Sequence, residues 1–149
     1  MIKLSNAALS ALPPGVTWAG YDRSRLTAGI LHFSVGNFHR AHQAVYLDQL
    51  IAGGGHDDWA ICGVGLMDDP RERAKAASFP RQDCLYTLLE RSDDAETVSV
   101  VGALCGVIYA GDGSAALLCI KSWVYRAIWA RWKPPRPRCT IPAVRPPRS

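Results

Sequence analysis

Residues 30–50, ILHFSVGNFHRAHQAVYLDQL, contain an apolar run, a glycine and then a segment with helical spacing. Gly36 separates the apolar run from the segment that opens on Phe38. A strand, a glycine turn and a helix in that order place backbone N–H groups against the pyrophosphate of a dinucleotide. The stretch therefore predicts an α/β fold with a parallel sheet and a dinucleotide site. The residues expected to line that site are Ser34, Val35, Gly36, Asn37, Phe38 and Arg40.

Residues 1–112 are expected to form four strands and two helices. The strands are predicted at 29–35, 59–66, 85–90 and 98–107, and the helices at 37–52, with Asn37 as N-cap, and from Pro70 to a stop at Pro80. The second strand is apolar throughout, which is typical of a buried parallel strand. The polar stretch 91–96 predicts a hairpin loop. A helix between the first two strands favours a right-handed βαβ crossover.

One side of the first predicted helix is expected to pack on the sheet. At helical spacing this side carries Phe38, Ala41, Ala44, Val45 and Ala52. Asp48 falls within the same arc, so the amphipathic pattern is imperfect.

The dinucleotide fingerprint G-x-G-x-x-G matches this chain at one of its three glycines. The three places hold Ser34, Gly36 and His39. The middle glycine is the one that lets the backbone approach the pyrophosphate. The alternative is a glycine that only turns a strand into a helix. Arg40 has two interpretations as well, a phosphate contact or a surface salt bridge.

An acidic pair follows the second predicted strand. Asp68 and Asp69 stand where a carboxylate would accept hydrogen bonds from the adenosine ribose hydroxyls. A carboxylate there also repels a 2′-phosphate, which favours NAD over NADP. Alternatively the pair caps the following helix, and the two roles can coexist.

The chain from about Tyr21 to Ile108 resembles the N-terminal part of the mannitol dehydrogenase family, the long-chain polyol dehydrogenases that include mannitol 2-dehydrogenase and fructuronate reductase. The matching segments are YDRSRLTAGILHF (21–33), VGNFHRAHQAVYLDQL (35–50), DWAICGVGL (58–66), QDCLYTLLER (82–91) and VVG (100–102). The resemblance implies a Rossmann domain followed by a mostly helical substrate domain. It also implies hydride transfer between NAD(P) and a sugar alcohol, ketose or hexuronate without a metal.

The chain departs from the family pattern at the turn and beyond the matching region. Ser34 stands where the family usually has glycine, and a serine held at positive φ costs about 1 kcal/mol or more. If φ is not positive there, Ser34 is tolerated and its hydroxyl can face a phosphate. We therefore expect weakened cofactor binding. The family resemblance places the general base, a lysine, in the second domain; no matching motif is present, so no catalytic residue is predicted.

Charge divides the chain near Gly111–Gly113. Residues 1–112 carry 9 Lys/Arg and 13 Asp/Glu, whereas residues 113–149 carry 8 Lys/Arg and no acid. The first part is expected to be the N-terminal part of a truncated Rossmann NAD-binding domain. The second is predicted to be a basic Pro/Arg-rich tail, disordered beyond about Lys133, with translation in a shifted reading frame as a hypothesis for its origin.

The basic tail also supports an alternative of another class. With its tryptophans, residues 113–149 could bind nucleic acid or an anionic membrane surface without any enzymatic activity. The primary expectation is instead a small-molecule polyol or ketose partner, with no specific nucleic acid and no membrane. A parallel sheet of few strands leaves an unpaired edge, which predicts self-association.

Metal binding and export are not predicted. His39 and His42 stand three apart, a spacing that suits a metal, but no third ligand is placed nearby. The five cysteines contain no C-x-x-C pair, which fits free thiols in a reducing cytosol. No signal peptide and no bilayer-spanning run is recognised, and we expect a cytoplasmic protein.

Overall fold

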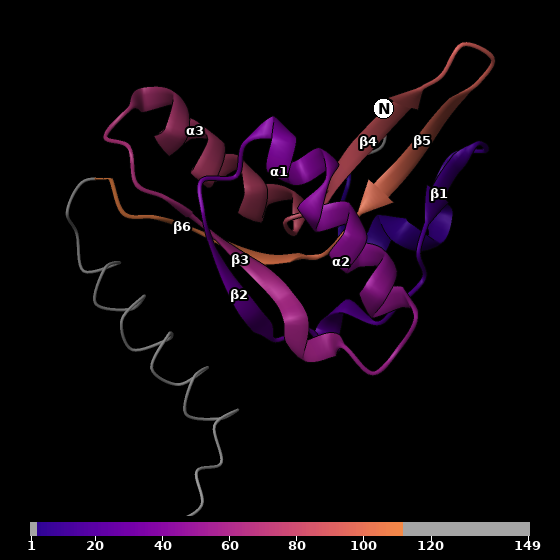
Figure 1. Ribbon diagram of the computed structural model, residues 1–149, viewed down its shortest axis with the longest axis horizontal. Helices are drawn as coiled ribbons and strands as arrows, with labels where there is room; N and C mark the ends of the chain where they lie inside the picture. The colour runs from indigo at the N-terminus through magenta and orange to yellow at the C-terminus, as the bar shows by residue number, and fades with distance from the viewer. Residues whose placement is uncertain (1–2, 112–149) are drawn as a thin grey trace, which may run out of the picture.

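The computed structural model describes residues 3–111, which form two three-stranded sheets with helices packed around one of them (Figure 1). The predicted α/β class is confirmed. The basic segment 113–149, with its predicted disorder and its alternative binding role, lies outside the described residues. Within residues 3–111, no helix is long and apolar enough to cross a membrane.

The first sheet is parallel and has the strand order β2-β3-β6. Its strands are β2 (Ala28–Phe33), β3 (Ala60–Gly65) and β6 (Leu104–Tyr109). Every residue of β3 is buried, which confirms the buried parallel strand predicted from the apolar run 59–66. The helical segment between β2 and β3 makes the predicted βαβ unit with parallel neighbours.

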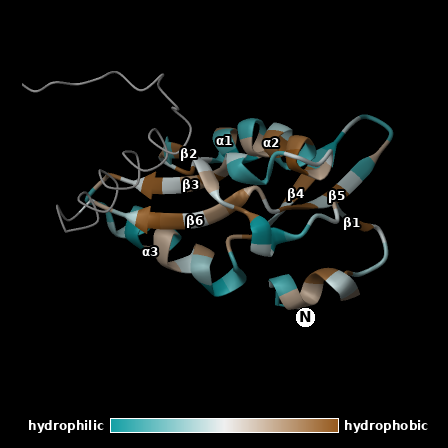
Figure 2. Cartoon of the chain, turned by 90° about the horizontal axis from the view of Figure 1, so that it is seen from below, coloured by the Kyte–Doolittle hydropathy of each residue, from teal (hydrophilic) through white to brown (hydrophobic). Residues whose placement is uncertain are grey.

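The helices pack on one face of this sheet: Gly63 of β3 faces Val35 just before α1, and Gly65, two residues on and therefore on the same face, faces Glu72 of α3. In Figure 2, α1 and α2 lie above β2 and α3 lies below β6. They span α1 (Asn37–Ala41), α2 (Gln43–Ala52) and α3 (Pro70–Ser78). The single helix predicted at 37–52 is wrong, because His42 leaves the helical region with φ −126° and ψ −82°. Gly36 is the N-cap and Asn37 the first helical residue, which corrects the predicted cap.

The predicted buried face of the first helix is also partly wrong. Phe38, Ala41 and Ala52 are exposed, and the buried residues of α2 are Ala44, Asp48 and Ile51. Because the helix is interrupted at His42, one continuous helical arc does not describe both α1 and α2. Asp48, the acid on the predicted apolar side, is therefore one of the three residues that α2 buries.

The ends of α3 follow the sequence closely. Pro70 is its first residue, and Asp69 caps it. The helix ends at Ser78, and Pro80 lies in the 3₁₀ turn Phe79–Gln82 that follows.

The second sheet has the order β1-β5-β4. Its strands are β1 (Val16–Trp18), β5 (Glu96–Val101) and β4 (Tyr86–Arg91). β4 and β5 pair antiparallel from Tyr86–Val101 out to Arg91–Glu96, which confirms the hairpin. β1 was not predicted from the sequence; it is three residues long and pairs parallel with β5. Short 3₁₀ segments lie at Asn6–Ala11, Arg23–Arg25 and Asp57–Trp59.

The chain changes sheets at Gly102 and Ala103, here called the crossing segment. A single strand predicted at 98–107 is wrong, because β5 and β6 belong to different sheets. The Gly102 amide donates to Asp48 Oδ1 at 2.7 Å, and the Tyr21 hydroxyl donates to the same oxygen at 2.6 Å. Periodicity alone does not reveal this break, since apolar residues continue through it.

Arg23 holds the crossing segment from the other side. Its Nε donates to the Gly102 carbonyl at 3.0 Å and its Nη2 to the Leu104 carbonyl at 2.7 Å. A Cβ on Gly102 would lie 2.7 Å from the Trp18 indole and 2.9 Å from Arg23 Nε. Only glycine lets these two side chains close over the backbone.

Gly102→Ala is therefore expected to destabilise the fold by about 2 kcal/mol, the usual cost of forcing extra volume into a packed site. The matched control is Gly36→Ala, because a Cβ at Gly36 meets nothing within 4 Å and its φ of −75° suits any residue. The control should cost less, about 0.5–1 kcal/mol, because alanine is a poorer N-cap than glycine but meets no clash there. Urea unfolding followed by circular dichroism measures both, and equal stability of the two variants would contradict the close packing at Gly102.

Candidate functional site

The carboxyl ends of β2, β3 and β6 meet at one edge of the parallel sheet. β2 runs into the turn at Ser34–Gly36, and β3 runs toward Asp68. β6 ends at Tyr109. In open parallel sheets, ligands bind outside the carboxyl ends of the strands. The fold therefore brings the turn and the acidic pair, which are separate in sequence, to the same edge.

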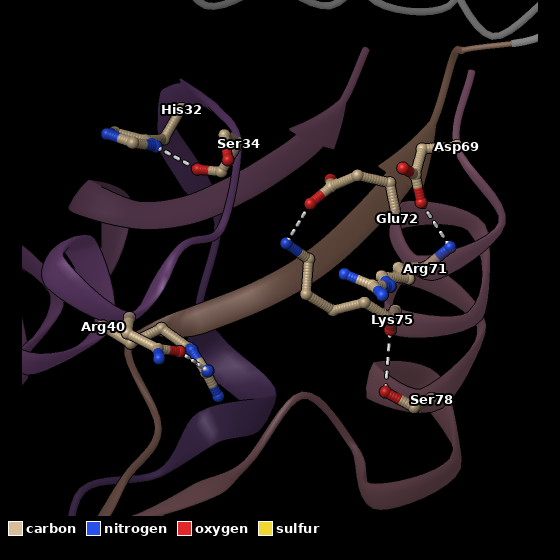
Figure 3. A network of polar contacts seen from close by, with 9 residues as sticks. His32, Ser34, Arg40, Asp69, Arg71, Glu72, Lys75 and Ser78 are labelled. Atoms are coloured by element: carbon tan, nitrogen blue, oxygen red, sulfur yellow. Dashed lines mark hydrogen bonds and ion pairs between the residues drawn. The ribbon is translucent and has the colours of Figure 1, made fainter. Parts of the chain in front are cut away.

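Ser34 adopts the left-handed conformation, with φ 68°. Its amide donates to the Val64 carbonyl at 2.7 Å, and its own carbonyl lies 2.6 Å from His32 Nδ1 (Figure 3). The two contacts fix the turn, so the serine carries the strain that a glycine would avoid. The positive φ at which a serine is expected to cost stability is therefore present at Ser34.

Val35 and Gly36 serve different purposes in the turn. Val35 is buried, and a Cβ on Gly63 would lie 2.2 Å from its Cγ2, so the glycine in β3 makes room for it. Gly36 has an ordinary φ of −75°, and open space surrounds its α-carbon. The fold requires glycine at 63 but not at 36.

His39 occupies the third place of the fingerprint and lies between α1 and β2. Its ring stacks on His32 with the centroids 3.7 Å apart, and its side chain is 5% exposed. Burial, then the neighbouring His32 and Arg40, lower the pKa of His39 to about 4. The ring is therefore neutral at neutral pH, and neither nitrogen has a hydrogen-bond partner within residues 3–111. In a standard fingerprint a glycine here allows close helix–strand contact.

The two histidines considered for metal binding have separate surroundings. His42 is exposed and stacks on Phe38, with its Nδ1 2.9 Å from the Phe38 carbonyl. Among the described residues, no group of three or more His, Cys, Asp or Glu side chains could hold a metal ion.

Arg40 contacts aromatic rings beneath the turn. Its guanidinium carbon lies 5.6 Å from the Tyr86 ring centre and 5.9 Å from that of Phe79, and Nη2 donates to Asn37 Oδ1. The Tyr86 hydroxyl donates to the Arg40 carbonyl at 2.6 Å, which ties α1 to the hairpin. Arg40 forms no ion pair among residues 3–111, and its buried Nε has no partner there.

The two acids of the pair have different surroundings. Asp69 Oδ1 accepts from the Arg71 amide at 2.6 Å, so its carboxylate caps α3 (Figure 3). Asp68 is exposed; its Oδ1 accepts from the Tyr109 hydroxyl at 3.2 Å and pairs with Arg73 at 3.3 Å. The capping interpretation is confirmed for Asp69, while Asp68 lies at the open edge.

No motif in the sequence indicated that Arg73 and Tyr109 are neighbours of Asp68. The Arg73 guanidinium carbon lies 5.2 Å from the Tyr109 ring centre, so the three side chains form one cluster. The signal was available in part, because Tyr109 ends a strand whose carboxyl end must share an edge with that of β3 in a parallel sheet.

A parallel sheet with a βαβ unit, helices on its face and a turn at the carboxyl ends of its strands is the arrangement of a Rossmann-type dinucleotide-binding domain. The family profile of the mannitol dehydrogenase Rossmann domain matches residues 28–119. The chain belongs to the mannitol dehydrogenase family.

Two relatives and one solved structure illustrate the similarity. The polyol:NADP oxidoreductase of Gluconobacter oxydans is 41% identical over 116 residues, which are 77% of this chain and 24% of the relative. The mannitol 2-dehydrogenase of Cereibacter sphaeroides is 45% identical over 103 residues, 69% of this chain and 21% of the relative.

The solved structure is Pseudomonas fluorescens mannitol 2-dehydrogenase in ternary complex with NAD and D-mannitol. It matches with a TM-score of 0.72 and 40% identity over 80% of this chain and 24% of that one. The chain thus spans about a quarter or less of the length of these proteins.

Ser34→Gly is expected to stabilise the chain by about 0.5–1 kcal/mol, because it removes the left-handed strain while adding some unfolded-state entropy. The comparison variant is Ser78→Gly, where φ is −77° and glycine brings the entropy cost and the loss of the Ser78 hydroxyl's hydrogen bond to the Lys75 carbonyl, without relief of strain. Chemical denaturation of both variants measures the difference. A Ser34→Gly variant that is less stable than the parent would show that the turn is not strained.

Proposed function

We propose that the chain binds a nicotinamide dinucleotide at the edge formed by the Ser34–Gly36 turn and Asp68. It would do so as the cofactor-binding part of an oxidoreductase that moves hydride between NAD(P) and a sugar alcohol or ketose. Membership of the mannitol dehydrogenase family and the dehydrogenase names of the relatives support this proposal. No catalytic residue is assigned within residues 3–111.

The observation that carries the proposal is the glycine at position 36. Neither its φ nor its surroundings require glycine, whereas Gly63 and Gly102 are each required by a neighbouring side chain. A glycine that the fold does not need is explained by close approach of a ligand to the backbone. The open space above its α-carbon is where the pyrophosphate would lie.

The remaining residues of the turn fit the same ligand. The first amides of a helix have no partner within it, so those that follow Gly36 can donate to phosphate oxygens. The exposed Ser34 hydroxyl adds a further donor beside the turn. When bound, the nicotinamide would supply the hydride acceptor or donor, and this part of the chain would hold and orient it.

Asp68 supports NAD as the coenzyme. Its exposed carboxylate can accept hydrogen bonds from ribose hydroxyls and would repel a 2′-phosphate. Arg73 beside it is the kind of residue that accommodates a 2′-phosphate, and one relative is named for NADP. The carboxylate between Arg73 and the edge is the feature that favours NAD in this chain.

The first test is NADH binding, followed by enhancement of nicotinamide fluorescence on titration with the full chain. Gly36→Val should lower the affinity at least about tenfold, because the added side chain fills the space that the pyrophosphate needs. Gly54→Ala, far from the edge in the Gly53–Gly55 turn after α2, tests for a general loss of folding. Equal NADH binding by Gly36→Val and the parent would refute the proposed site.

The second test concerns coenzyme choice. Asp68→Ser should raise the NADPH-to-NADH affinity ratio about tenfold, because it removes the repulsion and leaves Arg73 beside the ribose. Asp69→Ser is the matched control: it removes one charge but keeps a good capping residue for α3. Competition titrations give both ratios. A shift of the same size in the control would mean that net charge, not the position of Asp68, sets the preference.

A further inference from the structure

A cavity lies away from the candidate cofactor edge, between the β1-β5-β4 sheet and α2. Its volume is about 310 Å³, and none of the residues proposed to bind the dinucleotide lines it. The side chains that shape it are Trp18, Val45, Asp48, Gln49, Glu90 and Ser99. This cavity is called the Asp48 groove below.

The wall of the groove contains a buried carboxylate with no cation in contact. Asp48 is 6% exposed, and the donors that reach it are neutral: the Tyr21 hydroxyl and the backbone amides of the crossing segment. Burial raises the pKa of Asp48, against the lowering effect of these donors. Among residues 3–111, Asp48 forms no ion pair.

Arg23 is the nearby cation, and its guanidinium is committed elsewhere. Its three nitrogens donate to the Gly102 and Leu104 carbonyls and to the Asn6 side chain. It lowers the pKa of Asp48 only at longer range. A buried carboxylate in this state gains from a cation that can reach it through the groove.

The rest of the groove has the chemistry that such a cation needs. Glu90 adds a second carboxylate, the lining contains no Lys or Arg, and Trp18 contributes an aromatic ring. Val45 and its apolar neighbours offer a surface for a short alkyl chain. Gln49 and Ser99 supply further oxygens that can accept hydrogen bonds.

We propose that the Asp48 groove binds a primary alkylammonium group, either from a small amine or from a lysine side chain. The ammonium would lie toward Asp48, with Glu90 adding negative charge farther along the groove, and its alkyl stem would lie along Val45 and Trp18. An ammonium carries three donors and a full charge, so it can pair with a carboxylate where an alcohol of the same length cannot. The site is independent of the dinucleotide proposal, because it shares no residue with it.

The direct test is calorimetric titration of the full chain with n-butylammonium, with n-butanol as the neutral isostere. Binding of n-butylammonium without binding of n-butanol is expected. Nα-acetyl-lysine methylamide is titrated in parallel, and the tighter of the two cations identifies the source as a free amine or a lysine side chain. Failure of both cations to bind would overturn the proposal.

Variants that leave Asp48 in place make the test specific. Gln49→Lys puts an ammonium on a flexible stem inside the groove, so it should abolish n-butylammonium binding and raise the melting temperature. Gln43→Lys adds the same charge to an exposed position of the same helix outside the groove and should leave binding unchanged. Unaltered n-butylammonium binding by Gln49→Lys would show that the ligand lies elsewhere.

The second carboxylate is tested separately. Glu90→Gln should weaken n-butylammonium binding about threefold, as expected for one partly exposed charge. Asp94→Asn removes a charge from the loop of the same hairpin, outside the groove, and should have no effect. An equal loss in both variants would mean that only net charge matters, which would contradict binding of the ammonium in the groove that Glu90 lines.

Discussion

The hydrogen bonds at the crossing segment determine how the two sheets share one chain. A carboxylate from α2 accepts from the Gly102 amide, and a guanidinium from the N-terminal region donates to the Gly102 and Leu104 carbonyls. Without these partners, the polar backbone groups between β5 and β6 would be buried and unsatisfied, at a cost of about 1–3 kcal/mol each. Asp48, Tyr21 and Arg23 therefore fix the place where the antiparallel hairpin ends and the parallel sheet gains its third strand.

Three glycines differ in whether packing requires them. Gly63 leaves room for Val35, and Gly102 leaves room for Trp18 and Arg23, so packing requires glycine at both positions. Gly36 faces open space with an ordinary backbone conformation. At Ser34 the fold holds a left-handed turn that the chain occupies with a residue poorly suited to it. Packing therefore explains Gly63 and Gly102 but explains neither Gly36 nor Ser34.

Much of the fold could be predicted because its elements are local. The apolar run of β3, the cap and proline of α3, and the hairpin between β4 and β5 each carry their signal in neighbouring residues. Prediction failed where long-range contacts override the pattern: the helix breaks at His42, and the apolar run 98–107 divides between two sheets. For the candidate site, the sequence indicated the turn and the acidic pair, but it did not indicate the neighbours of Asp68, since they come from other elements.

The sequence by itself determined the family, the βαβ core of the fold and the residues of the turn, because these depend on motifs and on local periodicity. The tertiary structure alone decided that φ is positive at Ser34, that Asp69 caps a helix while Asp68 remains at the open edge, and that Asp48 lies buried in the wall of a groove. These outcomes depend on which distant groups meet each side chain, and a sequence pattern does not record distances between elements.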